Sequence, residues 1–262
     1  MNGPAVPVPP AGRDLLAGKV VLVTAAAGTG IGNATARRCI AEGATVVLSD
    51  AHERRLGEAA DELTELAGGV RPHSLVCDVT VEEQVQAMVD GTVAEHGRLD
   101  VVVNNAGLGG TAALVDMTDE QWHRVLDITL TGTMRCLRAS LRQMYGQGSG
   151  VIVNNASVLG WRAQAGQAHY AAAKAGVMAL TRSAAVEAAP HGVRVNAVAP
   201  SLAMHAFLAK VTTDELLDEL TEREAFGRAA EPWEIATVIA FLASDYSTYM
   251  TGEVVSVSSQ RA

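Results

Sequence analysis

The sequence predicts an α/β fold: one doubly wound parallel sheet of about seven strands, with helices on both faces. Short apolar runs alternate with longer amphipathic stretches about six times, which is typical of this architecture. Hydrophobic residues make up 48% and charged residues 19% of the 262 residues, enough for a sizeable core. No linker or change of composition divides the chain after residue 18. We therefore expect a single domain over residues 18–262, preceded by a loosely held, proline-rich tail over residues 1–17.

The expected strands are short and mostly rich in valine, as buried parallel strands are. In chain order they cover residues 19–24, 45–49, 70–76, 100–104, 150–155, 193–198 and 253–257. The expected helices cover about 31–42, 53–67, 81–97, 119–145, 168–189, 213–224 and 232–243. Thr118 or Asp119 can cap the fourth of these helices, and Pro232 fits the first turn of the last.

Composition narrows the classes of partner. The formal net charge is −9 and the aromatic content is 4%, which disfavours nucleic acid and anionic membranes as partners. The three cysteines, Cys39, Cys77 and Cys136, have neither a disulfide framework nor metal-ligand spacing. No secretory signal and no run of about 18 apolar residues is present, so we expect a cytoplasmic protein without a membrane span or metal.

A glycine-rich turn follows the first expected strand and opens the first helix. It begins at Ala25-Ala26-Ala27 and continues as Gly28-Thr29-Gly30-Ile31-Gly32. Glycine lets a backbone turn sharply and approach a pyrophosphate, and a helix N-terminus attracts phosphate. After the first strand of an alternating pattern, this turn predicts a dinucleotide site at residues 28–32. A plain strand–helix turn is the alternative reading.

Acidic residues end the second and third expected strands. Asp50 can accept hydrogen bonds from both hydroxyls of an adenosine ribose and repels a 2′-phosphate, which favours NAD over NADP. Arg54 and Arg55 follow closely and keep NADP open, unless they form the solvated first turn of a helix. Asp78, beside Val79, can meet the adenine or simply cap the following loop.

A catalytic set is visible in the second half of the chain. Tyr170 and Lys174 share one helical face, and a nearby ammonium is expected to lower the pKa of the phenol from its usual value near 10. Such a tyrosine is a usable general acid or base. Ser157 ends the fifth strand and can polarise a substrate carbonyl. Small residues at the end of the fourth strand, Asn105-Ala106-Gly107, suit the approach of a cofactor ribose.

This combination resembles the short-chain dehydrogenase/reductase family over nearly the whole chain from residue 18. The resemblance rests on the glycine turn, Asp50, Asp78, Asn104 to Gly107, Ser157, Tyr170, Lys174 and residues 194–200. It implies a Rossmann-type fold and hydride transfer between a nicotinamide and a carbonyl carbon. It further implies that Tyr170 moves the proton, that Lys174 binds the nicotinamide ribose, that Ser157 holds the carbonyl oxygen, and that the loop at Pro200 covers the nicotinamide. In the family, the helices that correspond to those expected at 119–145 and 168–189 build a dimer face, so the resemblance also implies a homodimer or homotetramer.

The chain departs from the family pattern in four places. Ala25 stands where the family usually has glycine. Thr129 replaces an asparagine that holds a water on a proton path to the lysine; we hypothesise a modified relay through Thr129, against simple packing. Ser201 follows Pro200 where glycine is usual, and His205 stands near the usual threonine, most simply as an exposed loop histidine. The chain end, residues 251–259, lacks a glycine-rich finish.

Four residues are candidates for substrate contact. Trp161 and Arg162 follow Ser157 and suit a bulky or anionic substrate, although both can instead be packing and surface residues. Met204 and Phe207 lie in residues 201–226, which we expect to form an apolar lid. The pattern is similar to actinobacterial reductases that handle CoA-linked ring ketones in steroid degradation, and more generally to 3-oxoacyl-carrier reductases.

The sequence therefore predicts an NAD(P)-dependent oxidoreductase that interconverts a ketone and a secondary alcohol on a bulky or CoA-linked substrate. Two alternatives stay open. One is a dehydrogenase of free hydroxysteroids or other alcohols. The other is a dinucleotide-binding sensor without catalysis, which Ala25 and Thr129 favour and the intact set of Ser157, Tyr170 and Lys174 disfavours.

Overall fold

Seven parallel strands form one sheet in the order β3-β2-β1-β4-β5-β6-β7, so the predicted fold class is confirmed. The chain is described from a computed structural model that covers residues 8–204 and 214–260. The strands are β1 (Val20–Thr24), β2 (Thr45–Asp50), β3 (His73–Val76), β4 (Val101–Asn104), β5 (Gly150–Asn155), β6 (Val193–Pro200) and β7 (Val254–Val257). The strand order reverses between β1 and β4, the position where open parallel sheets bind ligands.

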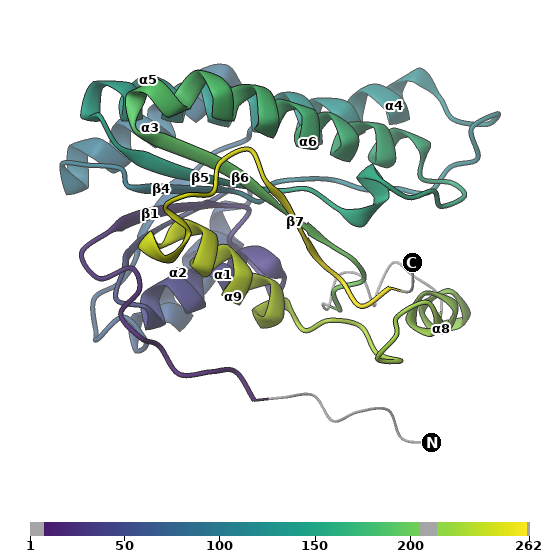
Figure 1. Cartoon of the computed structure of the whole chain (residues 1–262), viewed down its shortest axis with the longest axis horizontal. Coiled ribbons are helices and arrows are strands. Elements are labelled where there is room, and N and C mark those ends of the chain that lie inside the picture. The colour runs from purple at the N-terminus through teal and green to yellow at the C-terminus, as the bar shows by residue number, and fades with distance from the viewer. Residues whose placement is uncertain (1–7, 205–213, 261–262) are drawn as a thin grey trace.

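Helices cover both faces of the sheet (Figure 1). On one face lie α1 (Ile31–Ala41), α2 (Glu53–Thr64) and α9 (Pro232–Ala243). On the other lie α3 (Glu82–His96), α4 (Asp119–Leu126), α5 (Gly132–Gln147) and α6 (Ala168–Ala188). A further helix, α8 (Asp214–Glu222), lies beyond the end of the sheet (Figure 1). None of the helices in the described residues is long and apolar enough to cross a bilayer.

Each face of the sheet has its own buried core. Alternate residues of the strands point to opposite faces, so Val21 and Val23 pack beneath α1 and α9 while Val20 and Leu22 pack towards α3 and α5. Strands buried on both faces explain the continuous valine runs. This rigid sheet fixes the positions of the side chains at its carboxyl edge.

Several predicted boundaries differ from the structure by one to three residues, and two of the differences have a clear physical cause. The helix expected over 119–145 is interrupted by a π-helical turn, Asp127–Thr131, between α4 and α5. The strand expected over 70–76 begins at His73, because Pro72 lacks a donor for the ladder. The cap is Thr118, whose hydroxyl accepts the amide of Gln121 in a capping box.

The N-terminal segment is held before residue 18. Leu16 is fully buried, and the Glu42 carboxylate accepts the amides of Arg13, at 2.7 Å, and Leu15, at 3.2 Å. The part of the expected tail next to the domain is therefore packed against α1.

Candidate active site

The glycine turn takes a conformation that explains which of its positions need glycine. A Cβ on Gly32 would lie 2.2 Å from the Ala25 carbonyl oxygen, so no side chain fits there. Gly28 has φ +93° and faces open space, since a Cβ there would meet nothing within 4 Å. Ala25 has φ +49°, the left-handed conformation that favours glycine, so the departure at this position places an alanine in a strained conformation.

The same turn leads into a helix whose first amides are available. Gly30 is the N-cap of α1, which begins at Ile31, and no side chain caps it. Uncapped N–H groups at a helix start attract phosphate oxygens. The open space at Gly28 and the uncapped start of α1 together fit the pyrophosphate of a dinucleotide, with Thr29 between them.

Asp50 ties the end of β2 to the glycine turn. Its Oδ2 accepts the Ala27 amide at 3.2 Å, and its Oδ1 accepts the His52 amide at 3.0 Å. The carboxylate thus lies beside the turn, where an adenosine ribose is expected. Arg54 is exposed and pairs with Glu58 at 2.5 Å on the surface of α2. This agrees with the alternative that Arg54 belongs to the solvated first turn of a helix.

Asp78 and Val79 lie between β3 and α3. The Asp78 Oδ1 accepts the amide of Thr80 at 2.9 Å and its hydroxyl at 2.7 Å, which is the loop-capping geometry of the alternative reading. Val79 is buried against α5, since a Cβ on Gly132 would lie 2.7 Å from its side chain. Contacts of Asp78 and Val79 with an adenine stay a prediction.

The residues at the end of β4 are fixed by hydrogen bonds to β1. The Thr24 hydroxyl accepts the amides of Asn105, at 2.9 Å, and Ala106, at 3.1 Å. The Asn105 side-chain amide donates to the carbonyls of Thr24 and Ala25, both at 3.2 Å. Its oxygen therefore faces Asn155, whose side-chain amide donates to it at 2.9 Å. The end of β4 and the glycine turn are in this way one connected unit.

Ser157, Tyr170 and Lys174 come together at the carboxyl ends of β5 and its neighbours. The Ser157 side chain lies near the Tyr170 phenol and favours its ionised form. The Lys174 Nζ lies 5.5 Å from the centre of the Tyr170 ring and donates to the Asn155 carbonyl at 2.5 Å. Lys174 is buried and Tyr170 half-buried. The constellation predicted from the sequence is therefore assembled in space.

The acid–base properties of this pair differ from the sequence-based expectation. Burial raises the pKa of Tyr170 to about 12, and the nearby Ser157 side chain opposes this rise. Burial lowers the pKa of Lys174 to about 8. The expected lowering of the Tyr170 pKa by Lys174 was wrong for the chain alone, because the ammonium faces the ring and the Asn155 carbonyl.

Thr129 lies in the π-helical turn and is fully buried. Its hydroxyl accepts the Leu108 amide at 2.9 Å and donates to the Leu108 carbonyl at 3.0 Å. Its carbonyl accepts the Thr133 hydroxyl at 2.8 Å. Thr129 thus fixes the loop after β4, and its place in a proton relay stays a prediction.

The loop after β4 lies against Tyr170 and Lys174 of α6, a contact that was not predicted from the sequence. A Cβ on Gly107 would be 3.3 Å from the Lys174 Nζ, and one on Gly109 would be 3.8 Å from the Tyr170 ring. The glycines of Gly107-Leu108-Gly109-Gly110 allow this close approach, and their spacing was the available signal.

The expected substrate residues are only partly described. Trp161 is 50% exposed, and the Arg162 guanidinium donates to the Gln260 side chain at 2.6 Å. Met204 is half-buried, and its amide donates to the Ala230 carbonyl at 3.0 Å. Phe207 and His205 lie outside the described residues. Pro200 is buried at the end of β6.

Comparison with known proteins identifies the family. The family described as enoyl-(acyl carrier protein) reductase matches residues 25–259. The chain belongs to the short-chain dehydrogenase/reductase family. It is an oxidoreductase that interconverts a ketone and a secondary alcohol with a nicotinamide dinucleotide. Within the described residues, no group of three or more His, Cys, Asp or Glu side chains could hold a metal ion.

Two relatives and two solved structures show the range of this similarity. A (5R,7aS)-5-hydroxy-7a-methyl-1-oxo-2,3,5,6,7,7a-hexahydro-1H-indene-carboxyl-CoA reductase from Mycobacterium tuberculosis is 65% identical, over 99% of both chains. The 3-oxoacyl-[acyl-carrier-protein] reductase FabG of Thermotoga maritima is 41% identical, over 92% of this chain and 97% of its own. A short chain dehydrogenase from Mycobacterium smegmatis is 62% identical, with a TM-score of 0.88 over 98% and 99% of the chains. An NAD⁺-bound xylitol dehydrogenase is 36% identical, with a TM-score of 0.87 over 93% and 99%.

Proposed function

We propose that this short-chain dehydrogenase/reductase acts on a ring ketone, or the matching alcohol, carried on a CoA thioester, with NAD as its cofactor. The observation that carries the reaction class is the placement of Ser157 and the buried Lys174 beside Tyr170. The substrate class is supported by the CoA-thioester reductase that is 65% identical over 99% of both chains. The similarity to a reductase of carrier-linked 3-oxoacyl groups also supports a thioester substrate.

The residues divide the proton chemistry between them. A bound nicotinamide supplies or accepts the hydride. The Ser157 hydroxyl donates a hydrogen bond to the carbonyl oxygen and holds it near the Tyr170 phenol. With a pKa of about 12, Tyr170 is protonated at neutral pH and can donate its proton to the oxygen during ketone reduction. Lys174 lies where the nicotinamide ribose is expected, and with a pKa of about 8 it exchanges protons near neutral pH.

The preference for NAD rests on Asp50. Its carboxylate is held beside the glycine turn by the amides of Ala27 and His52, so it cannot move far from an incoming 2′-phosphate. Arg54, one of the two nearby cations that could offset this repulsion, is engaged by Glu58. We expect kcat/KM with NADH to exceed that with NADPH.

A panel of substrates tests the proposal directly. Acetoacetyl-CoA, a CoA-linked cyclohexanone carboxylate and the same free acid are assayed with NADH and NADPH in parallel. Turnover of the cyclic thioester with NADH, lost in Tyr170→Phe while the cofactor still binds, is the expected result. No turnover with any probe would instead favour the dinucleotide-binding sensor.

A free ring alcohol is the second candidate substrate. A cis-4-hydroxycyclohexanecarboxylate dehydrogenase from Sinomonas cyclohexanicum is 43% identical over 93% of this chain. Equal kcat/KM for the free acid and its CoA thioester would select this candidate over the first.

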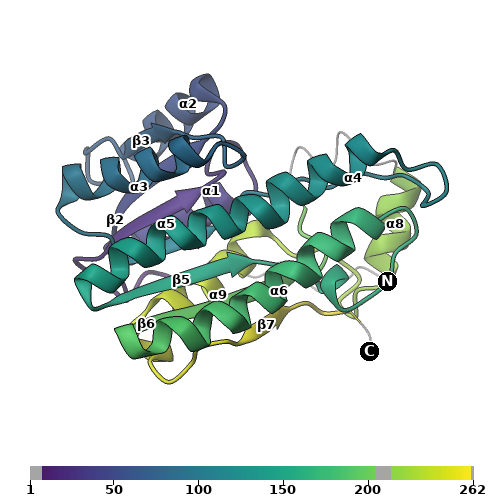
Figure 2. The ribbon, with the colours of Figure 1, turned by 90° about the horizontal axis from the view of Figure 1, so that it is seen from above.

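We also propose a homodimer or homotetramer built on the face that carries α4, α5 and α6. Figure 2 shows α5 and α6 running side by side along that face, with α4 continuing the line of α5. Val186, near the end of α6, is 77% exposed there. A sedimentation run that gives a monomer of 27.3 kDa would contradict this assembly.

A further inference from the structure

A carboxylate outside the catalytic set is buried between the end of β6 and the C-terminal segment. Glu224 follows α8 and is 2% exposed. Its Oε1 accepts the Leu202 amide at 3.4 Å. Its Oε2 accepts the Ser259 amide at 3.2 Å and the Ser259 hydroxyl at 2.8 Å. One side chain thus joins three segments that are distant in the sequence.

Backbone contacts extend this junction in both directions. Glu224 forms an antiparallel bridge with Gln260, and the Ala225 amide donates to the Ser259 carbonyl at 2.6 Å. The Gln260 side chain accepts the Arg162 guanidinium at 2.6 Å. Hydrogen bonds therefore run from Leu202, through Glu224 and the C-terminal segment, to the loop that carries Arg162.

The two ends of this path are the segments expected to contact substrate and cofactor. Leu202 comes two residues after Pro200, at the end of β6, and its carbonyl accepts the Ala230 amide at 2.8 Å. Arg162 follows Trp161 in the loop after Ser157. We propose that Glu224 is a positioning residue, which holds these two segments in register and sets the affinity for a large substrate; this rests on the proposed function.

The chemistry of the junction requires a carboxylate. Leu202 and Ser259 each present an N–H, to different oxygens of Glu224. A carboxylate accepts on both oxygens, whereas the amide of glutamine accepts on one and donates from the other. Glu224→Gln therefore turns a donor towards one of the two N–H groups and opens the junction on that side.

Three variants test the proposal. Glu224→Gln is compared with Glu222→Gln, an identical change of charge at an exposed position two residues earlier, and with Ser259→Ala, which removes one of the three bonds. Acetoacetyl-CoA and the CoA-linked cyclohexanone carboxylate are the probes. We expect Glu224→Gln to raise KM about tenfold, the equivalent of one hydrogen bond to a charged group, and to leave kcat within about twofold. Ser259→Ala should raise KM less, and Glu222→Gln should not change it.

A second measurement separates this inference from the proposed function. Amide hydrogen exchange at Leu202 and Ser259 should be faster in Glu224→Gln and unchanged in Glu222→Gln. Unchanged KM and unchanged exchange in a folded Glu224→Gln would overturn the proposal; if that variant does not fold, unchanged values in Ser259→Ala would do so. Absence of wild-type turnover with both probes would contradict the proposed substrate class. The hydrogen-exchange data would then be the test of whether Glu224 holds the two segments together.

Discussion

Lys174 lies in the predicted catalytic set, but its burial disfavours the charged form of its side chain. Its side chain is 3% exposed, and its pKa shifts from 10.5 to about 8, which corresponds to roughly 3 kcal/mol. At pH 7 the folded chain therefore holds a buried ammonium that the unfolded chain hydrates freely. This cost is full below pH 8 and disappears as pH rises to 10.5, so stability should rise over that range.

Lys174→Met removes this cost together with the catalytic cation. At pH 7 we expect a gain in the free energy of unfolding of roughly 2–3 kcal/mol, reduced by the lost hydrogen bond to Asn155. The gain should shrink towards pH 10.5, and turnover should be almost abolished. Urea unfolding at pH 7 and pH 10 measures the first effect. A variant that is less stable than the wild type at both values would contradict the assignment.

Ala25 is a second residue at which local strain is visible. Its φ of +49° costs an L-residue about 1–2 kcal/mol, while glycine gains flexibility in the unfolded chain worth about 0.4–1 kcal/mol. Ala25→Gly should therefore raise the free energy of unfolding by up to about 1 kcal/mol. Ala26→Gly, at a buried neighbour without positive φ, should lower it. Equal destabilisation of both variants in a denaturant titration would show that Ala25 is not strained.

At the scale of the element, helices and strands were predictable where the local sequence pattern alone determines the secondary structure. Valine runs located β1, β4 and β5 to within a residue or two, because strands buried on both faces need continuous apolar sequence. The π-helical turn between α4 and α5 was not predictable. Its backbone hydrogen bonds span five residues instead of four, and this change leaves no mark on the spacing of apolar residues in the sequence. The contacts of Glu224 were likewise invisible, because its partners lie 22 and 35 residues away.

The π-helical turn gives Thr129 a role that a variant can isolate. Thr129→Val keeps the shape of the side chain but leaves the Leu108 amide and carbonyl without the hydroxyl that pairs both. We expect a loss of about 1–3 kcal/mol in stability and a several-fold fall in kcat, as the loop over Lys174 loosens. Because the hydroxyl is committed to Leu108, the pH profile of kcat should not move. Thr129→Ser should restore both quantities, and a shifted pH profile in Thr129→Val would instead support the proton relay.

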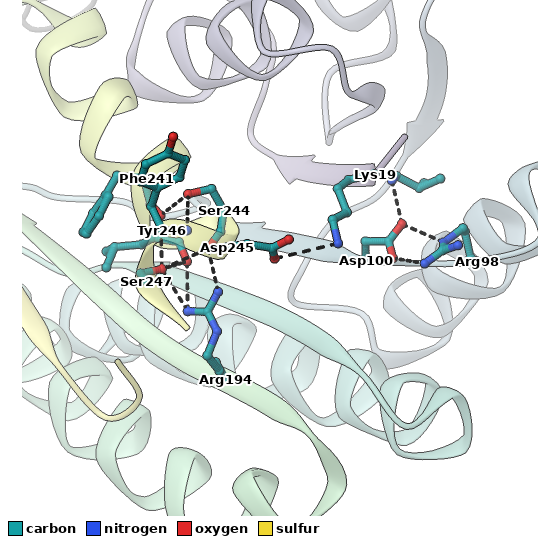
Figure 3. A network of polar contacts seen from close by, with 11 residues as sticks. Lys19, Arg98, Asp100, Arg194, Phe241, Ser244, Asp245, Tyr246 and Ser247 are labelled. Atoms are coloured by element: carbon teal, nitrogen blue, oxygen red, sulfur yellow. Dashed lines mark hydrogen bonds and ion pairs between the residues drawn. The ribbon is translucent and has the colours of Figure 1, made fainter. Parts of the chain in front are cut away.

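At the scale of the whole molecule, the amino edge of the sheet holds the scaffold and the carboxyl edge holds the chemistry. Figure 3 shows Arg194, at the start of β6, pointing into the turn after α9. Its guanidinium donates to the carbonyls of Leu242 at 3.1 Å and Ser244 at 3.0 Å, and to the Ser247 hydroxyl at 3.0 Å. These contacts satisfy the free carbonyls at the end of α9 and attach that helix to the sheet.

This division predicts that the two edges can be perturbed separately. Arg194→Lys keeps the positive charge, but an ammonium cannot reach the carbonyls that the planar guanidinium spans, so unpaired carbonyls remain buried. We expect a loss of about 2–4 kcal/mol in the free energy of unfolding, with KM and kcat unchanged at temperatures where the variant is folded. Lys19→Met is the matched control, because Lys19 lies 3.9 Å from a largely exposed Asp245 and should cost less than about 1 kcal/mol. Changed kinetics in a folded Arg194→Lys would mean that the amino edge is coupled to the active site across the sheet.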